Sequence, residues 1–296
     1  MVKLSAIKLS AIKLSAIQLN AKPNVDENIQ AIAKHLAQIT AGNSHDQHLV
    51  VLPECCLFFG SNDQAQLQLA KESKPLKGDL LSLLQQMLSE LAKQYGVYLV
   101  AGTVPLINNQ AADHHDKFTN TSCIFNPEGK MLASYDKIHL FDASINDTAK
   151  TVTAKSYDES CYTQAGNKLC VVKTPLATIG LTVCFDIRFP VLYQKLNALG
   201  ADIITVPSAF TRVTGKAHWQ TLLQARAIEN QVYIIAAGQE GVHDNGRETW
   251  GHSMIISPWG EILSCLEEGE GYISTTFLPK EINRIRAAMP LNSPLT

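Results

Sequence analysis

The segment IGLTVCFDIRFPVLYQKLNALGADIITVPSAFT, residues 179–211, carries the clearest fold signal in the chain. Apolar residues alternate through residues 179–183, which indicates a strand, and residues 203–206 form a second apolar run. Pro190 is suited to the first turn of a helix between these runs. The segment therefore predicts a strand–helix–strand unit of an α/β fold, with Cys184 on the sharp turn from strand to helix.

This turn is a suitable position for a nucleophile. It would hold the sulfur of Cys184 clear of the sheet and point the backbone N–H of Phe185 at a reacting carbonyl. A thiol near a helix N-terminus has a reason to ionise, so we expect a reactive thiolate. The alternative is that Cys184 is a small buried side chain that only packs.

The composition of the 296 residues excludes several classes of partner. The formal net charge is −2 and there is no run of lysine or arginine, so neither nucleic acid nor a membrane is an expected partner. No apolar run approaches the roughly 18 residues of a membrane span. The seven cysteines are odd in number and lack C-x-x-C spacing, which predicts free thiols in a reducing cytoplasm rather than disulfides or a zinc site.

The N-terminus repeats the pentapeptide KLSAI three times in tandem. A period of five fits neither a strand nor a helix. We therefore interpret residues 1–12 as a duplicated extension, expect the first strand at residues 13–20, and assign residues 13–296 to a single domain.

The two halves of the chain share a pattern. Val51-Leu52-Pro53 returns as Thr205-Val206-Pro207, and the apolar run at residues 98–101 returns at 233–236. The hairpin signal SCIFNPEG at residues 122–129 likewise returns as SMIISPWG at 253–260. Two similar sheets, each with helices on one face, predict a four-layer α-β-β-α sandwich with an internal pseudo-twofold repeat.

Helices with one apolar face are expected at residues 24–42, 79–95 and 217–230. In the second of these, Leu80 and Met87 are expected to point into the core. The helix at 217–230 implies that residues 211–216 form a loop.

Three chemically active side chains follow predicted strands: Glu54, Lys137 and Cys184. Open α/β sheets build their sites beyond the carboxyl ends of strands, so we expect these side chains to meet. Each also has an ordinary structural explanation: a helix cap for the glutamate, a surface charge for the lysine and core packing for the cysteine.

The segments VVLPE, YDKIHLFD and GLTVCFDIRFP, in this order, resemble the three signatures of the nitrilase superfamily of carbon–nitrogen hydrolases. The resemblance implies the α-β-β-α fold and an amidase that forms a Cys thioester and needs no cofactor or metal. It also implies that Cys184 attacks the amide, that Glu54 is the acid and base, and that Lys137 and the Phe185 N–H stabilise the oxyanion. Glu159 matches a fourth site residue, which would hold Lys137 in its charged form.

Further polar residues near these motifs have other expected roles. Asp186 and Arg188 are expected to brace the turn by ion pairing. His139, His218 and His252 lack the i, i+4 spacing of a helical zinc site, so no metal is expected.

The segments HLFDASINDT, SYDES and AAGQEGVHDNGRETWGHSM resemble the branch that hydrolyses deaminated glutathione to 2-oxoglutarate and Cys-Gly. The neighbouring branch is ω-amidase, which acts on 2-oxoglutaramate and 2-oxosuccinamate. Both branches take small anionic amides, so the pocket should offer cations or N–H donors. Phe210, Arg212 and Lys216 are the candidate substrate-binding residues, although the two charges also fit an ordinary solvated loop.

The resemblance further implies a homodimer or larger homo-oligomer that associates through the face carrying the Cys184 turn. The alternative hypothesis is a non-enzymatic function, in which the chain keeps this fold as a catalytically silent binding or scaffold protein.

Overall fold

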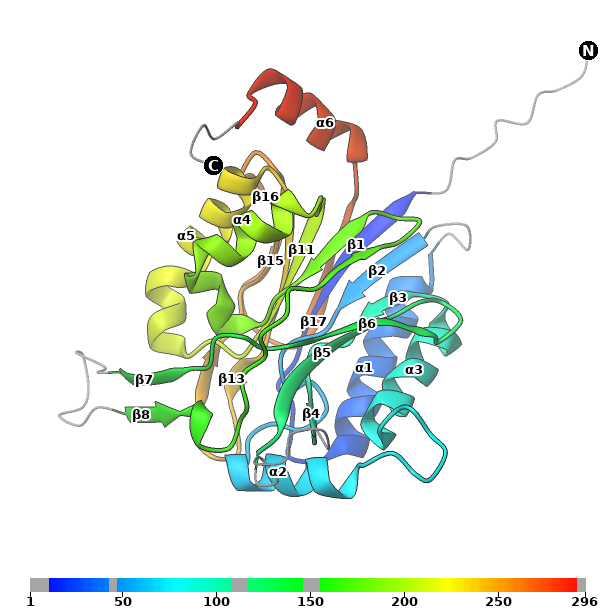
Figure 1. Ribbon diagram of the computed structural model, residues 1–296, viewed down its shortest axis with the longest axis vertical. Coiled ribbons are helices and arrows are strands. Elements are labelled where there is room, and N and C mark those ends of the chain that lie inside the picture. The colour runs from blue at the N-terminus through cyan, green and yellow to red at the C-terminus, as the bar shows by residue number, and fades with distance from the viewer. Residues whose placement is uncertain (1–10, 43–46, 108–116, 146–154, 292–296) are drawn as a thin grey trace, which may run out of the picture.

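The computed structural model describes residues 11–42, 47–107, 117–145 and 155–291, and its centre is a pair of stacked sheets (Figure 1). The strands of the first sheet are β1 (Ile12–Gln18), β2 (Gln47–Val51), β3 (Tyr98–Val100), β4 (Val104–Leu106), β5 (Thr119–Phe125), β6 (Met131–Asp136) and β17 (Gly271–Thr276). They lie in the order β17-β1-β2-β3-β5-β4, and β6 pairs with β5.

The strands of the second sheet are β9 (Val171–Lys173), β10 (Thr178–Leu181), β11 (Ile203–Ser208), β12 (Tyr233–Gly238), β15 (Ser253–Ile256) and β16 (Ile262–Leu266). They lie in the order β16-β15-β12-β11-β10-β9. Two separate antiparallel pairs complete the strands: β7 (Asp142–Ile145) with β8 (Lys155–Asp158), and β13 (Glu240–Val242) with β14 (Glu248–Trp250).

The topology confirms the internal repeat. Strands β1, β2 and β3 are parallel and continue into the antiparallel pair β5 and β6. Strands β10, β11 and β12 are also parallel and continue into the antiparallel pair β15 and β16. An antiparallel strand closes the other edge of each series, β17 beside β1 and β9 beside β10.

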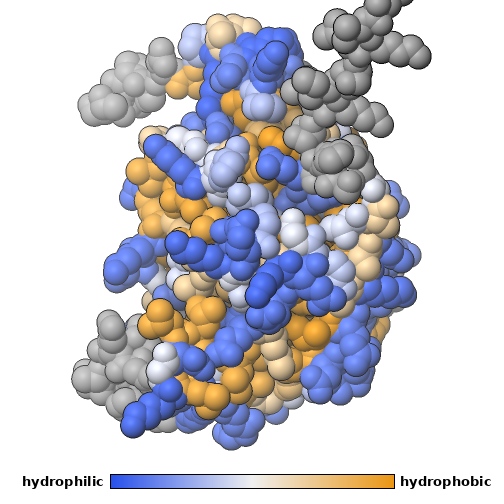
Figure 2. All heavy atoms as spheres, turned by 90° about the vertical axis from the view of Figure 1, so that its right-hand side faces the viewer, coloured by the Kyte–Doolittle hydropathy of each residue, from blue (hydrophilic) through white to orange (hydrophobic). Residues whose placement is uncertain are grey.

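Helices cover the outer face of each sheet. The helices are α1 (Val25–Thr40), α2 (Asp63–Glu72), α3 (Leu83–Tyr95), α4 (Pro190–Ala198), α5 (Arg212–Asn230) and α6 (Pro279–Ala288). Figure 1 shows α1 and α3 outside the first sheet and α4 and α5 outside the second. Figure 2 shows the side of the first sheet, where hydrophilic side chains are interspersed with smaller apolar areas. Among the described residues, no helix is long and apolar enough to cross a membrane.

The apolar strands explain why the sheets stack. On β2, Leu49 and Val51 pack toward the second sheet, while Val50 packs toward α1 and α3. Successive side chains of a strand point to opposite faces, so a strand that is apolar throughout needs cover on both sides. Residues such as Val206 and Ile235 of the second sheet complete the layer between the sheets. The sequence-based prediction of a four-layer sandwich is confirmed.

Two helices begin at residues other than those predicted from the sequence. Helix α3 begins at Leu83 rather than at residue 79, because the Ser82 hydroxyl accepts from the Gln85 N–H and the Gln85 side chain accepts from the Ser82 N–H. Leu80 therefore precedes the helix and is 96% exposed, and Met87 is 39% exposed, so the predicted inward positions of both were wrong.

Helix α5 begins five residues before the predicted start of 217, because the Thr211 hydroxyl caps it by accepting from the Thr214 N–H at 3.4 Å. Arg212 and Lys216 consequently lie on the first turns of a helix rather than on a loop. Sequence analysis did not predict α2 or α6.

The proposed N-terminal extension, residues 1–12, lies outside the described residues except for positions 11 and 12. Ile12 is the first residue of β1, and its carbonyl accepts from the Phe277 N–H at 2.8 Å.

Candidate active site

Cys184 lies three residues after the end of the second-sheet strand β10 and is the first residue of the short 3₁₀ helix η2 (Cys184–Arg188). Its φ of 47° lies in the left-handed region, which is uncommon for a residue with a side chain. The side chain is buried. The sharp turn between strand and helix is therefore present, and helix α4 follows it at Pro190 as expected.

Asp186 holds this turn in place. Its fully buried carboxylate accepts hydrogen bonds from the Val183 N–H at 2.9 Å and the Tyr135 hydroxyl at 2.7 Å. The backbone N–H and ring Nδ1 of His139 also approach it, at 3.0 and 2.7 Å. These contacts tie the turn to the segment that carries Lys137, two residues before His139.

Arg188 does not pair with Asp186, so this part of the bracing prediction was wrong. Its guanidinium lies over the rings of Phe185 and Phe210, at 5.6 and 5.3 Å from their centres. The half-buried position lowers the pKa of Arg188 below its ordinary value, because burial disfavours the charged form. The described residues place no acidic partner within ion-pair distance of it.

Lys137 lies between two carboxylates. Its Nζ is 2.9 Å from Glu54 Oε1 and 2.8 Å from Glu159 Oε2, and its side chain is only 2% exposed. Two more donors hold Glu54: the Asn120 side chain at 2.9 Å and the backbone N–H of Ala209 at 2.9 Å. The structure therefore brings Glu54, Lys137 and Glu159 together from three separate parts of the chain.

Mutual attraction keeps these buried charges ionised. Burial is the largest influence on the Lys137 pKa and lowers it, but the attraction of Glu159 and Glu54 outweighs burial and sets this pKa well above its ordinary value. Burial likewise acts to raise the Glu54 pKa, but the charge and hydrogen bond of Lys137 leave it below its ordinary value. At neutral pH the Lys137 ammonium therefore faces an ionised Glu54.

Cys184 is a neutral thiol in this environment, which corrects the expectation of a resting thiolate. Burial and the negative charge of Glu54 raise the pKa of its thiol, and together they outweigh the attraction of Lys137. The thiol hydrogen-bonds Glu54, so an ionised base and its proton donor already lie in contact.

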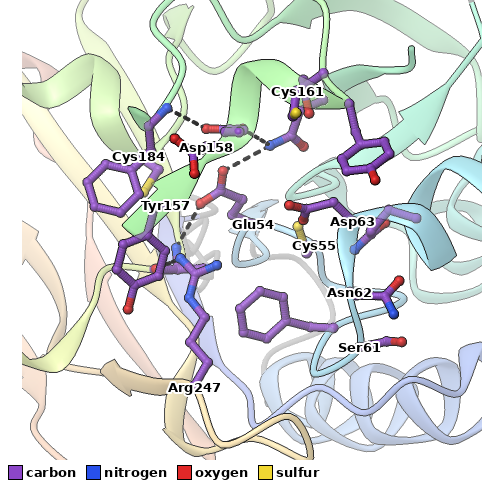
Figure 3. A pocket seen from close by; sticks show the side chains of 18 of the residues that line it. Glu54, Cys55, Ser61, Asn62, Asp63, Tyr157, Asp158, Cys161, Cys184 and Arg247 are labelled. Carbon is purple, nitrogen blue, oxygen red and sulfur yellow. Dashed lines mark hydrogen bonds between the residues drawn. The ribbon is translucent and has the colours of Figure 1, made fainter. Parts of the chain in front are cut away.

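A pocket of about 500 Å³ opens over this group (Figure 3). Glu54, Lys137, Glu159 and Cys184 all line it. Residues that sequence analysis did not single out also line it, namely Cys55, Phe59, Asp63, Asn120, Tyr157 and Arg247.

Arg247 precedes β14, and its Nη2 donates to the carbonyl of Ala209 at 3.0 Å. It belongs to the segment GRETWGHSM, which carried part of the family resemblance, so the signal for this residue was present but unused.

Of the three predicted substrate-binding residues, one lines a cavity beside Cys184 and two do not. Phe210 lines a small cavity beside Cys184, together with Phe185 and Arg188. Arg212 is not among the residues that line either cavity, and it pairs instead with Glu248 at 2.8 Å. Lys216 is exposed on α5 and also lines neither cavity, so the placement of these two basic residues at the pocket was wrong.

The described residues contain no group of three side chains placed to hold a metal ion. His139 stacks on Phe189, and His252 stacks on Trp250, with ring centres 3.5 and 4.0 Å apart. His218 Nδ1 lies 3.3 Å from a guanidinium nitrogen of Arg188.

Comparison with known proteins agrees with this geometry. The model of the carbon–nitrogen hydrolase family matches residues 13–287. A Yersinia enterocolitica protein named deaminated glutathione amidase is 38% identical over 268 residues, which are 90% of this chain and 87% of the relative. A Mus musculus protein of the same name is 40% identical over 250 residues, 84% of this chain and 72% of the relative.

Among solved structures, Saccharomyces cerevisiae Nit3, described as a member of branch 10 of the nitrilase superfamily, superposes with a TM-score of 0.82. The two chains are 31% identical, and the superposition covers 96% of each.

Proposed function

The chain belongs to the carbon–nitrogen hydrolase family, and we propose that it is the amidase that cleaves deaminated glutathione into 2-oxoglutarate and Cys-Gly. One observation carries the chemistry: Cys184, Glu54 and Lys137 line one pocket, the Cys184 thiol has Glu54 as its hydrogen-bond partner, and Lys137 Nζ lies 2.9 Å from Glu54 Oε1. The group lies under a pocket large enough for a small peptide.

In the proposed reaction Glu54 takes the thiol proton as the sulfur of Cys184 attacks the amide carbon. The attack forms a C–S bond and moves the carbonyl electron pair onto oxygen. Lys137 Nζ and the Phe185 N–H would donate hydrogen bonds to that oxyanion. Loss of one such donor costs about 3 kcal/mol of barrier in other hydrolases.

The oxyanion then collapses and breaks the C–N bond, and Glu54 gives its proton to the leaving nitrogen. Cys-Gly departs as an amine and leaves a thioester on Cys184. Glu54, again ionised, takes a proton from water as the water oxygen attacks the thioester carbon. The C–S bond then breaks, the sulfur of Cys184 takes this proton back from Glu54, and 2-oxoglutarate leaves as an acid that ionises in solution. Glu159 is the positioning residue of this scheme, because it holds Lys137 in place through contacts at 2.8 and 3.0 Å.

The choice of substrate rests on the relatives and on the charge of the cavities. Proteins named deaminated glutathione amidase are 38–40% identical over most of the chain. Deaminated glutathione carries a carboxylate at each end, and cationic side chains line both cavities beside Cys184: Arg188 the smaller and Arg247 the larger. Each can receive a carboxylate.

The test compares kcat/KM for deaminated glutathione and for 2-oxoglutaramate, using the wild-type protein and Cys184→Ala. We expect deaminated glutathione to be preferred, and Cys184→Ala to remain folded but lose on the order of 10⁶-fold in kcat. A tenfold preference for 2-oxoglutaramate would instead assign the protein to ω-amidase. A folded wild-type protein that hydrolyses neither amide would support the scaffold interpretation.

We also propose that the protein works in the cytoplasm as a homodimer or larger homo-oligomer. All seven cysteines are free thiols, which suits a reducing compartment. Exposed apolar side chains on or next to the two helices that follow the Cys184 turn support an interface there: Val191 on α4, Leu199 at the C-cap of α4 and Ile228 on α5. Sedimentation analysis would test the assembly, and a monomer at micromolar concentration would contradict it.

A further inference from the structure

Arg247 is a basic residue of the pocket that has no acidic partner among the described residues. No carboxylate of the described residues lies within ion-pair distance of it, although Asp63 and Asp158 line the same pocket. Its Nε is buried and makes no hydrogen bond among the described residues. Lys137, the other basic residue lining this pocket, is already held between two carboxylates.

Aromatic rings fix the position of the Arg247 guanidinium. Its central carbon lies 5.2 Å from the ring centre of Phe59 and 5.3 Å from that of Tyr157. Figure 3 shows the Arg247 side chain extending toward Glu54, beside Tyr157. A guanidinium held in this way keeps its remaining N–H groups available as a planar donor for a carboxylate.

A single residue connects Arg247 to the proton donor of the reaction. The Ala209 N–H donates to Glu54 Oε2 at 2.9 Å, and the Ala209 carbonyl accepts from Arg247 Nη2 at 3.0 Å. Glu54 and Arg247 therefore lie on the same side of the site, separated by the length of one residue.

We propose that Arg247 binds the carboxylate of the leaving amine, that is, the C-terminal carboxylate of the dipeptide that departs. This inference rests on the proposed function. Glu54 has to protonate the departing nitrogen, so the leaving group must lie on the Glu54 side of the scissile bond. An extended dipeptide spans about 7 Å, which is enough to reach from a nitrogen beside Glu54 to a guanidinium one residue away.

The experiment crosses a change in the enzyme with a change in the substrate. Arg247→Met and the wild-type protein are assayed on deaminated glutathione, on its C-terminal carboxamide and on 2-oxoglutaramate, whose leaving group is ammonia. Arg212→Met is the matched control, because this arginine pairs with Glu248 outside the pocket.

We expect Arg247→Met to lower kcat/KM for deaminated glutathione about 10- to 100-fold, the usual worth of a hydrogen bond to a charged group. The carboxamide should lower the wild-type value by a similar factor but leave the value for Arg247→Met nearly unchanged. For 2-oxoglutaramate, kcat/KM should differ by less than about threefold between the wild-type protein and Arg247→Met. Arg247→Lys should recover part of the loss on deaminated glutathione.

Equal losses on deaminated glutathione and 2-oxoglutaramate would overturn the inference, because Arg247 would then act on the shared acyl part or on Glu54. A wild-type protein that cleaves the carboxamide as well as the acid would also overturn it, and this arm needs no variant. Failure of the proposed function looks different: the wild-type protein would not cleave deaminated glutathione at all, and the inference would fall with it.

Discussion

Replacement of Asp186 by asparagine tests whether the Cys184 turn depends on one buried carboxylate. Asp186 Oδ1 faces the backbone N–H and ring Nδ1 of His139, and Oδ2 faces the Val183 N–H and the Tyr135 hydroxyl. An asparagine keeps a single oxygen and places an NH₂ group opposite two donors. The change therefore removes two hydrogen bonds to a charged acceptor in a fully buried position.

Each such bond contributes about 1.5–3 kcal/mol, so Asp186→Asn should lower the free energy of unfolding by about 3–6 kcal/mol. This is a large part of the roughly 5–15 kcal/mol that stabilises a typical domain. Urea unfolding measures the change, and kcat on deaminated glutathione should fall as well, because Val183 immediately precedes Cys184. The matched control is Glu281→Gln on α6, an exposed pair with Arg284 whose loss should leave the unfolding curve unchanged.

A loss of less than about 1 kcal/mol for Asp186→Asn would refute this reasoning, since it would mean that the four contacts do not depend on the carboxylate charge. If Asp186→Asn were clearly destabilised but kept its kcat, the carboxylate would stabilise the fold without controlling the geometry of the Cys184 turn. That result would contradict the predicted fall in kcat.

Three further results are expected. Because Lys137 holds the Glu54 pKa below its ordinary value, kcat/KM should stay constant as the pH falls toward about 4.3. The stability that this pair contributes is present above that value and lost as the pH falls through the lower folded-state pKa of Glu54. In Lys137→Met the acid limb of the kcat/KM profile should move to higher pH, and an unmoved limb would argue against the pairing. Iodoacetamide should alkylate Cys184 at least about 100-fold more slowly in Glu54→Gln, because the neutral thiol needs this base, whereas an unchanged rate would indicate a free thiolate. Gly215→Ala on α5 should destabilise the protein by about 1–3 kcal/mol, because its Cβ would meet the Trp250 side chain, and Gly42→Ala, with open space around it, should not; equal thermal shifts would contradict this.

The sequence was sufficient for the parts of the fold that depend on local pattern. The apolar runs and Pro190 located the Cys184 turn, and the recurrence of three blocks indicated two stacked sheets. The strand-end positions of Glu54, Lys137 and Cys184 were enough to suggest that these side chains converge.

The remaining features depend on tertiary geometry that a sequence does not display. The start of α5 depends on the Thr211 hydroxyl, which caps the helix and places Arg212 and Lys216 on its first turns. The neutral state of Cys184 follows from burial beside Glu54, which local helix-terminus reasoning does not include. Arg247 reaches the site because the β13–β14 pair docks beside the first and second sheets, through the bridges Leu19↔Gln239 and Thr211↔Thr249.

The most direct test is to locate the covalent intermediate. Wild-type protein is mixed with deaminated glutathione, quenched with acid during turnover, digested and mapped by mass spectrometry. The account predicts one 2-oxoglutaryl group, attached as a thioester to the peptide that contains Cys184. Acylation of Cys55 or Cys161, the other two thiols that line the pocket, or turnover with no acylated peptide at all, would contradict it.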